Sequence, residues 1–116
     1  MLAMANTLTE LLAKKCTHRP TKLAEPEVAA LLALLPSCTR HGQEIVQTFR
    51  FATYRQTVAA FNAVAEVAEA ENHHPDCEVG YGKLAVRFTT HDCGGLSIND
   101  FICAAKCQHA IASQAA

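Results

Sequence analysis

A long helix with a recognisable start and a forced end most strongly constrains how this chain can fold. Thr53 and Gln56 have the spacing of a capping box, in which each side chain accepts a hydrogen bond from the other residue's backbone N–H. Apolar residues then recur with the period of a helix, and Pro75 cannot continue it, so we expect the helix to end near Asn72. The stripe predicted to be buried comprises Tyr54, Val58, Phe61, Val64, Ala65 and Ala68.

Strand-like segments lie on both sides of this helix. Residues 45–51 alternate well enough for a strand, after a plausible turn at His41-Gly42. Residues 79–81 and 84–90 indicate two further strands, and Gly82-Lys83 between them suits a tight hairpin turn. In this interpretation His91 ends the last strand, on the face that carries Thr89.

Shorter helix signals occupy the rest of the chain. Leucines at 8, 11 and 12 could form a short helix, and Pro26 suits the first turn of a helix that begins near Glu25 and ends at Pro36. Ser97 and Asp100 form a second capping box before a last apolar stripe. This order predicts an α+β domain, in which a small antiparallel sheet of about four strands carries helices on one face.

Size and composition limit the class of protein. With 116 residues, the chain is expected to be an N-terminal extension, residues 1–22, followed by one domain, residues 23–116. A net charge of −1 and 50% hydrophobic residues do not fit a disordered tail or a basic nucleic-acid binder. No apolar run approaches the roughly 20 residues that span a bilayer, and no signal-peptide pattern is evident. We therefore expect a cytoplasmic protein, or a nuclear one in a eukaryote, with no membrane partner.

Six cysteines in a short chain raise the question of disulfides. They occur without a CxxC pair and without a secretory context, so we interpret most of them as reduced, small hydrophobic residues.

A spaced set of polar residues is the strongest signal of function. Asn72-His73-His74-Pro75 follows the long helix and Thr90-His91-Asp92 follows the hairpin, with Glu69 and Asp100 outside them. Imidazole is the side chain best suited to moving protons near neutral pH, so this set predicts acid/base chemistry on a small molecule. Simpler roles remain open, because Glu69 could lie on a solvated face and Asp100 could be only a cap. His18, His41 and His109 have no such context and are interpreted as surface residues.

Zinc is the main alternative for these side chains. Imidazole and thiolate groups are its usual ligands, but adjacent histidines seldom bind one ion, and no paired knuckle motif is present. The candidate ligands would be His73, His74, Cys77, His91 and Cys93.

Taken in order, the polar residues resemble the motif of the pterin-4a-carbinolamine dehydratase family. The matching positions are Glu69, His73-His74-Pro75, Tyr81, His91 and Asp100, and every gap between them fits. Residues 49–51 and 89–97 and the segments around 28–36 also look like family sequence, so the resemblance covers roughly residues 23–111.

The resemblance implies a lyase that dehydrates a 4a-hydroxytetrahydropterin without a metal or an organic cofactor. It implies that His73, His74 and His91 form the acid/base set and that Glu69 and Asp100 orient or tune it. The substrate contacts it implies come from His73, His74, His91, Asn72, Pro75, Thr90, Asp92 and Cys93. It also implies a homodimer or homotetramer and a functional link to an aromatic amino acid hydroxylase.

Three positions depart from the family pattern. Asn72 stands where animal members carry Asp, and Cys77 and Cys38 stand where Trp is frequent. The changes at 72 and 77 bear on substrate affinity or rate. Some relatives act as coactivators and others as assembly factors without the histidines, so a non-catalytic binding module on the same fold is the alternative function.

Overall fold

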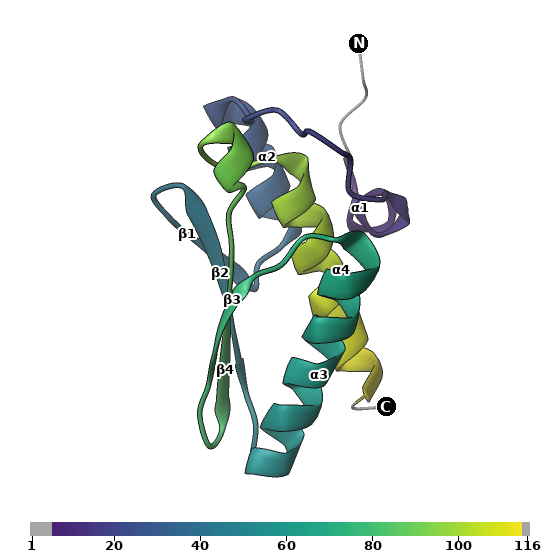
Figure 1. The fold of residues 1–116 in the computed structure, drawn as a ribbon, viewed down its shortest axis with the longest axis vertical. Coiled ribbons are helices and arrows are strands. Elements are labelled where there is room, and N and C mark those ends of the chain that lie inside the picture. The colour runs from purple at the N-terminus through teal and green to yellow at the C-terminus, as the bar shows by residue number, and fades with distance from the viewer. Residues whose placement is uncertain (1–5, 115–116) are drawn as a thin grey trace.

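In a computed structural model, which describes residues 6–114, helices cover one face of a four-stranded antiparallel sheet (Figure 1). This arrangement confirms the predicted α+β class. The elements in chain order are α1 (Leu8–Ala13), α2 (Glu25–Leu34), β1 (Cys38–His41), β2 (Glu44–Arg50), α3 (Tyr54–Glu71), β3 (Asp76–Val79), β4 (Lys83–Phe88), the 3-10 helix η1 (His91–Cys93) and α4 (Ile98–Gln114).

The sheet has the strand order β1-β2-β4-β3, so β2 and β4 are central. Strand β2 confirms the segment predicted at 45–51, shifted by one residue. Strand β1 was not assigned from the sequence, because four residues give too short an alternation. It forms because β2 offers a free edge, where the backbone of Thr39 pairs with that of Val46.

The hairpin between β3 and β4 differs from its predicted form. Val79 pairs with Leu84, and the N–H of Gly80 donates to the carbonyl of Lys83 at 2.8 Å. The tip of the turn is therefore Tyr81-Gly82 rather than Gly82-Lys83. Gly82 is required at the tip, because a Cβ there would lie 2.6 Å from the carbonyl oxygen of Phe51.

Helix α3 begins and ends as predicted. Thr53 and Gln56 form the capping box, and Asn72 ends the helix in a left-handed conformation with φ of 51°. The buried stripe, however, is rotated from the predicted one, because Tyr54 and Phe61 are exposed. Val64 and Ala68 of the predicted stripe are buried, and Thr57 and Ala60 are buried with them in place of the two aromatic residues.

The N-terminal extension packs on the domain. Thr7 caps α1 by accepting from the N–H of Glu10, and α1 lies against α4 (Figure 1). Leu11 is fully buried in the same core cluster as Phe101. Within residues 6–114, no helix has the length and apolarity to cross a membrane.

Candidate active site

The end of α3 directs His73 toward the start of α4. Because Asn72 takes a left-handed conformation, the chain turns after the helix, and the N–H of His73 closes the turn by donating to the carbonyl of Ala68. The His73 ring stacks on the ring of Phe88, with centroids 5.9 Å apart and planes 9° apart. Its Nε2 atom lies 2.7 Å from Oδ1 of Asp100, and its side chain is 14% exposed.

Asp100 is fully buried and satisfied by hydrogen bonds. Its Oδ2 atom accepts from the backbone N–H of Ser97 and from the hydroxyl of Thr90, each at 2.9 Å. The Ser97 hydroxyl lies 2.7 Å from that of Thr90 and accepts from the N–H of Asn99. Since the Thr90 proton is committed to Asp100, Ser97 donates to Thr90, and the three side chains form one chain of hydrogen bonds that ends at the Asp100 carboxylate.

This network fixes the tautomer of His73. An ionised carboxylate only accepts hydrogen bonds, so the proton between the two side chains lies on Nε2 of His73 and leaves Nδ1 for a further partner. The carboxylate also lies in the first turn of α4, where the helix dipole favours negative charge. Asp100 therefore serves both as the predicted helix cap and as the residue that orients His73.

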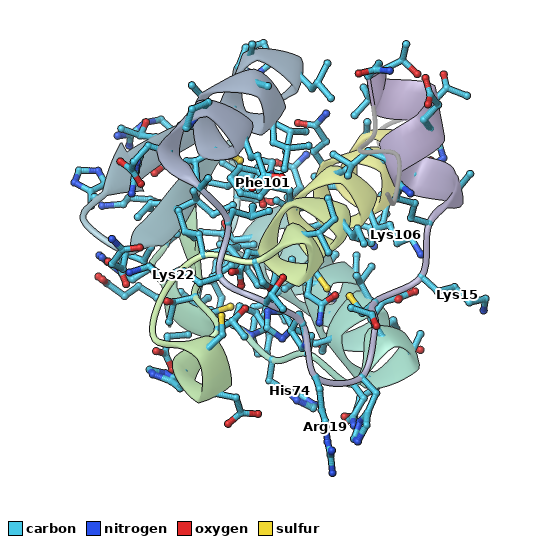
Figure 2. The ribbon with its side chains drawn as sticks, turned by 90° about the horizontal axis from the view of Figure 1, so that it is seen from above. Lys15, Arg19, Lys22, His74, Phe101 and Lys106 are labelled. Atoms are coloured by element: carbon cyan, nitrogen blue, oxygen red, sulfur yellow. The ribbon has the colours of Figure 1, made fainter. Side chains whose placement is uncertain are left out.

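His74 and Glu69 form a second pair, on the surface. Nε2 of His74 lies 2.7 Å from Oε2 of Glu69, while the two side chains are 55% and 78% exposed. Figure 2 shows His74 projecting outward, whereas Phe101 lies within the molecule. An exposed pair of this kind contributes only about 0–1 kcal/mol to stability. We therefore interpret its geometry as a matter of the position of His74 rather than of the stability of the fold.

The loop after β4 holds the remaining predicted residues. Strand β4 ends at Phe88, so His91 does not end a strand; it begins η1 and is exposed. The correction has a simple cause: Thr90 and Gly95 pair across the loop, with the N–H of Thr90 donating to the carbonyl of Gly95 at 3.0 Å. The Cys93 thiol donates to the carbonyl of Thr90 at 3.5 Å, and Pro75 is half-buried before β3.

A pocket of about 340 Å³ opens between these elements. Its wall contains four of the predicted residues: Asn72, His73, Thr90 and Asp92. His74 and His91 are not part of this wall. The opposite wall comes from residues 16–20 of the extension, together with Glu71 and Asn99, and sequence reasoning missed it. His18 belongs to this wall, although it was interpreted as an ordinary surface residue. The one available signal was the polar and basic Thr17-His18-Arg19-Pro20 break ahead of α2.

The candidate zinc ligands do not form a cluster in the described part of the chain. Across residues 6–114, no group of three or more His, Cys, Asp or Glu side chains could hold a metal ion. The six cysteines are free thiols.

The fold and the His73–Asp100 pair define a small α+β protein with a pocket lined by a histidine. Residues 21–110 match the family model described as pterin 4 alpha carbinolamine dehydratase, and the chain belongs to that family.

Curated relatives are about half identical to this chain. One from Chromobacterium violaceum is 49% identical over 98 residues, which are 83% of this chain and 91% of the relative. One from Xanthomonas campestris is 52% identical over 87 residues, covering 73% of this chain and 74% of the relative. Both carry the name "Putative pterin-4-alpha-carbinolamine dehydratase".

Two solved structures share the fold. A transcriptional coactivator/pterin dehydratase from Brucella melitensis aligns with a TM-score of 0.74 and 24% identity, over 78% of this chain and 98% of that one. A pterin dehydratase-like protein identified as a RuBisCO assembly factor in the alpha-carboxysome aligns with a TM-score of 0.53 and 20% identity, over 64% and 86%.

Proposed function

We propose that this chain dehydrates a 4a-hydroxytetrahydropterin, giving the quinonoid dihydropterin and water. The observation that carries the proposal is the position of His73, which the buried Asp100 orients at the wall of a pocket. The pocket volume of about 340 Å³ lies in the range of small-molecule sites, about 300–1,000 Å³. Family membership supplies the reaction class.

The reaction needs two proton movements and no change of oxidation state. The C4a–O bond breaks as the hydroxyl takes a proton and leaves as water, and N5 loses its proton as the C4a–N5 double bond forms. His73, with Nδ1 free, is assigned to one of these transfers, and His74 and His91 complete the acid/base set. General acid/base catalysis of this kind contributes about 10²–10⁴-fold to a rate.

The carboxylates are assigned to orientation and charge. Asp100 holds His73, and Glu69 holds His74. Each carboxylate lies within hydrogen-bond distance of an imidazole nitrogen and so orients the ring for proton transfer. Because the loss of water is coupled to proton transfer and involves no change of oxidation state, the assignment requires no metal or organic cofactor.

The other predicted residues are assigned to substrate binding. Thr90, Asp92 and Asn72 line the pocket together with His73. Cys93 and Pro75 shape the two segments that carry the histidines. The backbone of the Thr90–Gly95 loop offers groups that could bind the flat pterin ring.

In the cell, this reaction would recycle the tetrahydropterin cofactor of an aromatic amino acid hydroxylase. We also propose that the chain forms a homodimer or homotetramer. Strands β1 and β3 are edges of the sheet, and Tyr54 and Tyr81 stack on each other while 52% and 71% exposed. Light scattering with size exclusion would measure the molar mass, and a monomer at micromolar concentration would contradict this part.

A direct assay tests the dehydratase proposal. A chemically generated 4a-hydroxytetrahydropterin is mixed with the protein and EDTA, and its dehydration is followed by ultraviolet absorbance. We expect acceleration over the spontaneous reaction and its loss in His73→Ala, with His41→Ala as the matched control on the exposed end of β1. If the folded wild type gives no acceleration, the alternative of a non-catalytic binding module replaces the enzyme.

A further inference from the structure

Residues 16–20, hereafter the strap, lie against the end of α3 and the start of α4 and form one wall of the pocket. The family match begins only at residue 21, so the strap lies outside it. Its first anchor is Asn99, a nearly fully buried residue near the start of α4. The Asn99 side-chain amide accepts from the N–H of Thr17 and donates to the Thr17 carbonyl, both at 2.9 Å.

A second anchor lies at the end of α3. Oε1 of Glu71 accepts from the N–H of Cys16 at 2.8 Å, and Oε2 accepts from Nζ of Lys106 at 2.7 Å. The Glu71 side chain is only 10% exposed. A buried polar group raises the free energy of the folded state unless it is paired. Glu71 and Asn99 are paired with the backbone of the strap, so they hold it against the domain.

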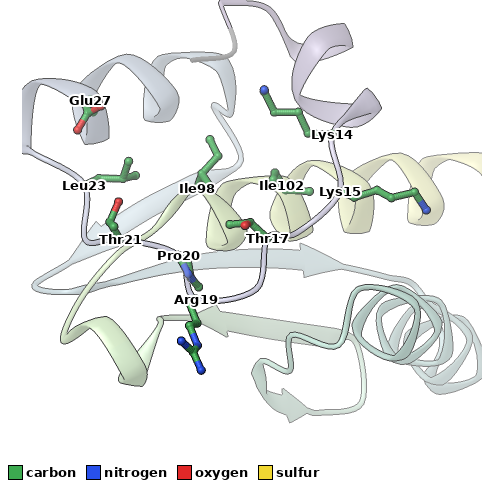
Figure 3. Close-up of a pocket in the computed structure, with 10 residues that line it drawn as sticks. All are labelled: Lys14, Lys15, Thr17, Arg19, Pro20, Thr21, Leu23, Glu27, Ile98 and Ile102. Carbon is green, nitrogen blue, oxygen red and sulfur yellow. The ribbon is translucent and has the colours of Figure 1, made fainter. Parts of the chain in front are cut away.

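The anchored strap holds Arg19 in an unusual conformation. Its φ is 59°, in the left-handed region that favours glycine and asparagine, and Pro20 follows it. Such strain persists where the surrounding structure enforces it and is frequent at binding sites. In Figure 3 the Arg19 side chain points away from Leu23, Ile98 and Ile102, the apolar residues behind the strap.

Arg19 is exposed, and it lines the same cavity as His73, Thr90 and Asp92. Three basic side chains of the domain pair with acids, namely Arg40 with Glu25, Arg87 with Glu44 and Glu78, and Lys106 with Glu71, whereas Lys22, Arg50, Arg55 and Lys83 form no ion pair within residues 6–114. Arg19 forms no ion pair within residues 6–114. A guanidinium offers five donors in a planar array, which suits a ligand with several oxygen atoms.

We infer that Arg19 is a specificity residue, and that it binds an oxygen-rich side chain carried by the pterin ring at C6. This inference rests on the proposed function. With the reacting ring placed beside His73, a substituent on the ring would meet the strap, which lines the same pocket. Hydroxyl groups and a phosphate group share the chemistry that Arg19 recognises.

Arg19→Asn is the sharpest test, because asparagine tolerates the left-handed conformation and removes the guanidinium. Turnover is measured with three 4a-hydroxytetrahydropterins that bear a 6-methyl, a 6-(polyhydroxypropyl) or a phosphorylated 6-(hydroxypropyl) group. We expect KM to rise at least about fivefold for one or both oxygen-rich substrates, with kcat unchanged and with the 6-methyl substrate unaffected. A rise confined to the phosphorylated substrate, and reduced by salt, would identify phosphate as the group bound.

Lys15→Asn is the matched control, since it removes a like charge from the neighbouring segment and Lys15 points away from the strap in Figure 3. We expect it to leave all three KM values unchanged. An equal change for all substrates in Arg19→Asn would overturn the inference, because Arg19 would then bind the ring itself. No change for any substrate would overturn it as well.

Binding measurements separate this inference from the dehydratase proposal. Calorimetry with stable 7,8-dihydropterins carrying the same three side chains needs no turnover. If the wild type lacks activity but Arg19→Asn selectively weakens the oxygen-rich dihydropterins, the specificity role stands and the dehydratase proposal fails. If the wild type is active, but both it and Arg19→Asn bind the three dihydropterins with equal affinity, the specificity role fails and the dehydratase proposal stands.

Discussion

His73 and Asp100, 27 positions apart in the chain, are joined by a hydrogen bond of 2.7 Å between Nε2 and Oδ1. The bond links the residue that follows α3 to the first turn of α4. The remaining oxygen of Asp100 is held by Ser97 and Thr90, so the carboxylate cannot turn away. One buried acid thus connects the two long helices, the loop after β4 and the histidine of the pocket.

Asp100→Asn should keep the fold and change the tautomer of His73. The amide oxygen can still accept from Ser97 and Thr90, but the amide nitrogen would donate to Nε2 of His73, which forces the ring proton to Nδ1. We expect the rate of pterin dehydration to fall by at least about tenfold. Thermal unfolding checks that the variant is folded. Wild-type turnover in a folded variant would show that the tautomer of His73 is irrelevant.

His74→Ala and His73→Ala separate the surface pair from the buried pair. We expect His74→Ala to lower turnover by at least about tenfold without unfolding the domain, and His73→Ala to have the larger effect, because only His73 lines the pocket. His41→Ala is the control for a lost surface imidazole. Unchanged activity in His74→Ala would remove His74 from the acid/base set.

Glu71 should make the stability of the fold depend on pH in the acid range. Burial raises the pKa of its carboxyl, but the hydrogen bonds from Cys16 and Lys106 outweigh burial and hold the pKa below its ordinary value of 4.5. Because the folded-state pKa is the lower one, the stabilisation is present above pH 4.5 and is lost as the pH falls below it. Urea unfolding between pH 3 and 7 should therefore show a shallower acid loss in Glu71→Gln. Parallel curves for the two proteins would show that the anchor contributes nothing.

Buried thiols should weaken the fold in alkali. Burial raises the pKa of Cys107 from 9.0 to about 12, and it raises the pKa values of Cys38 and Cys77 to about 11. A folded-state pKa above the unfolded value gives stability that is complete below pH 9.0 and is lost as the pH rises toward the folded pKa. Cys107→Ala should lower stability at pH 8 but flatten its decline up to pH 11. An unchanged slope would contradict burial of an ionisable thiol at this position.

Local signals were sufficient for the long elements. The Thr53–Gln56 capping box and Pro75 delimit α3, because the first supplies partners for free N–H groups and the second removes one. Pro26 likewise marks the first turn of α2, and the leucines that follow it have the spacing of a helix. The histidine pair at the end of α3 was also visible, since its position depends only on where the helix stops.

Tertiary contacts decided the rest. Strand β1 exists because β2 leaves an edge, and the buried face of α3 is rotated so that Thr57 and Ala60 are buried while Tyr54 and Phe61 are exposed. Thr57 could be buried there because its hydroxyl donates to the carbonyl of Tyr81 at 2.8 Å, a partner from the distant hairpin. The hydrophobic period of the sequence carries no information about a partner so far along the chain.

The sequence by itself determined the order of the elements and the residue types available for proton transfer, because helix caps, proline and hydrophobic period act over a few positions. Only the tertiary structure joined His73 to Asp100 and laid the strap across the pocket. Both depend on side chains that are far apart in the chain and meet only after the core has packed. Asp100, Asn99 and Glu71 are buried by that packing and therefore need polar partners, and residue spacing alone does not show which partners they have.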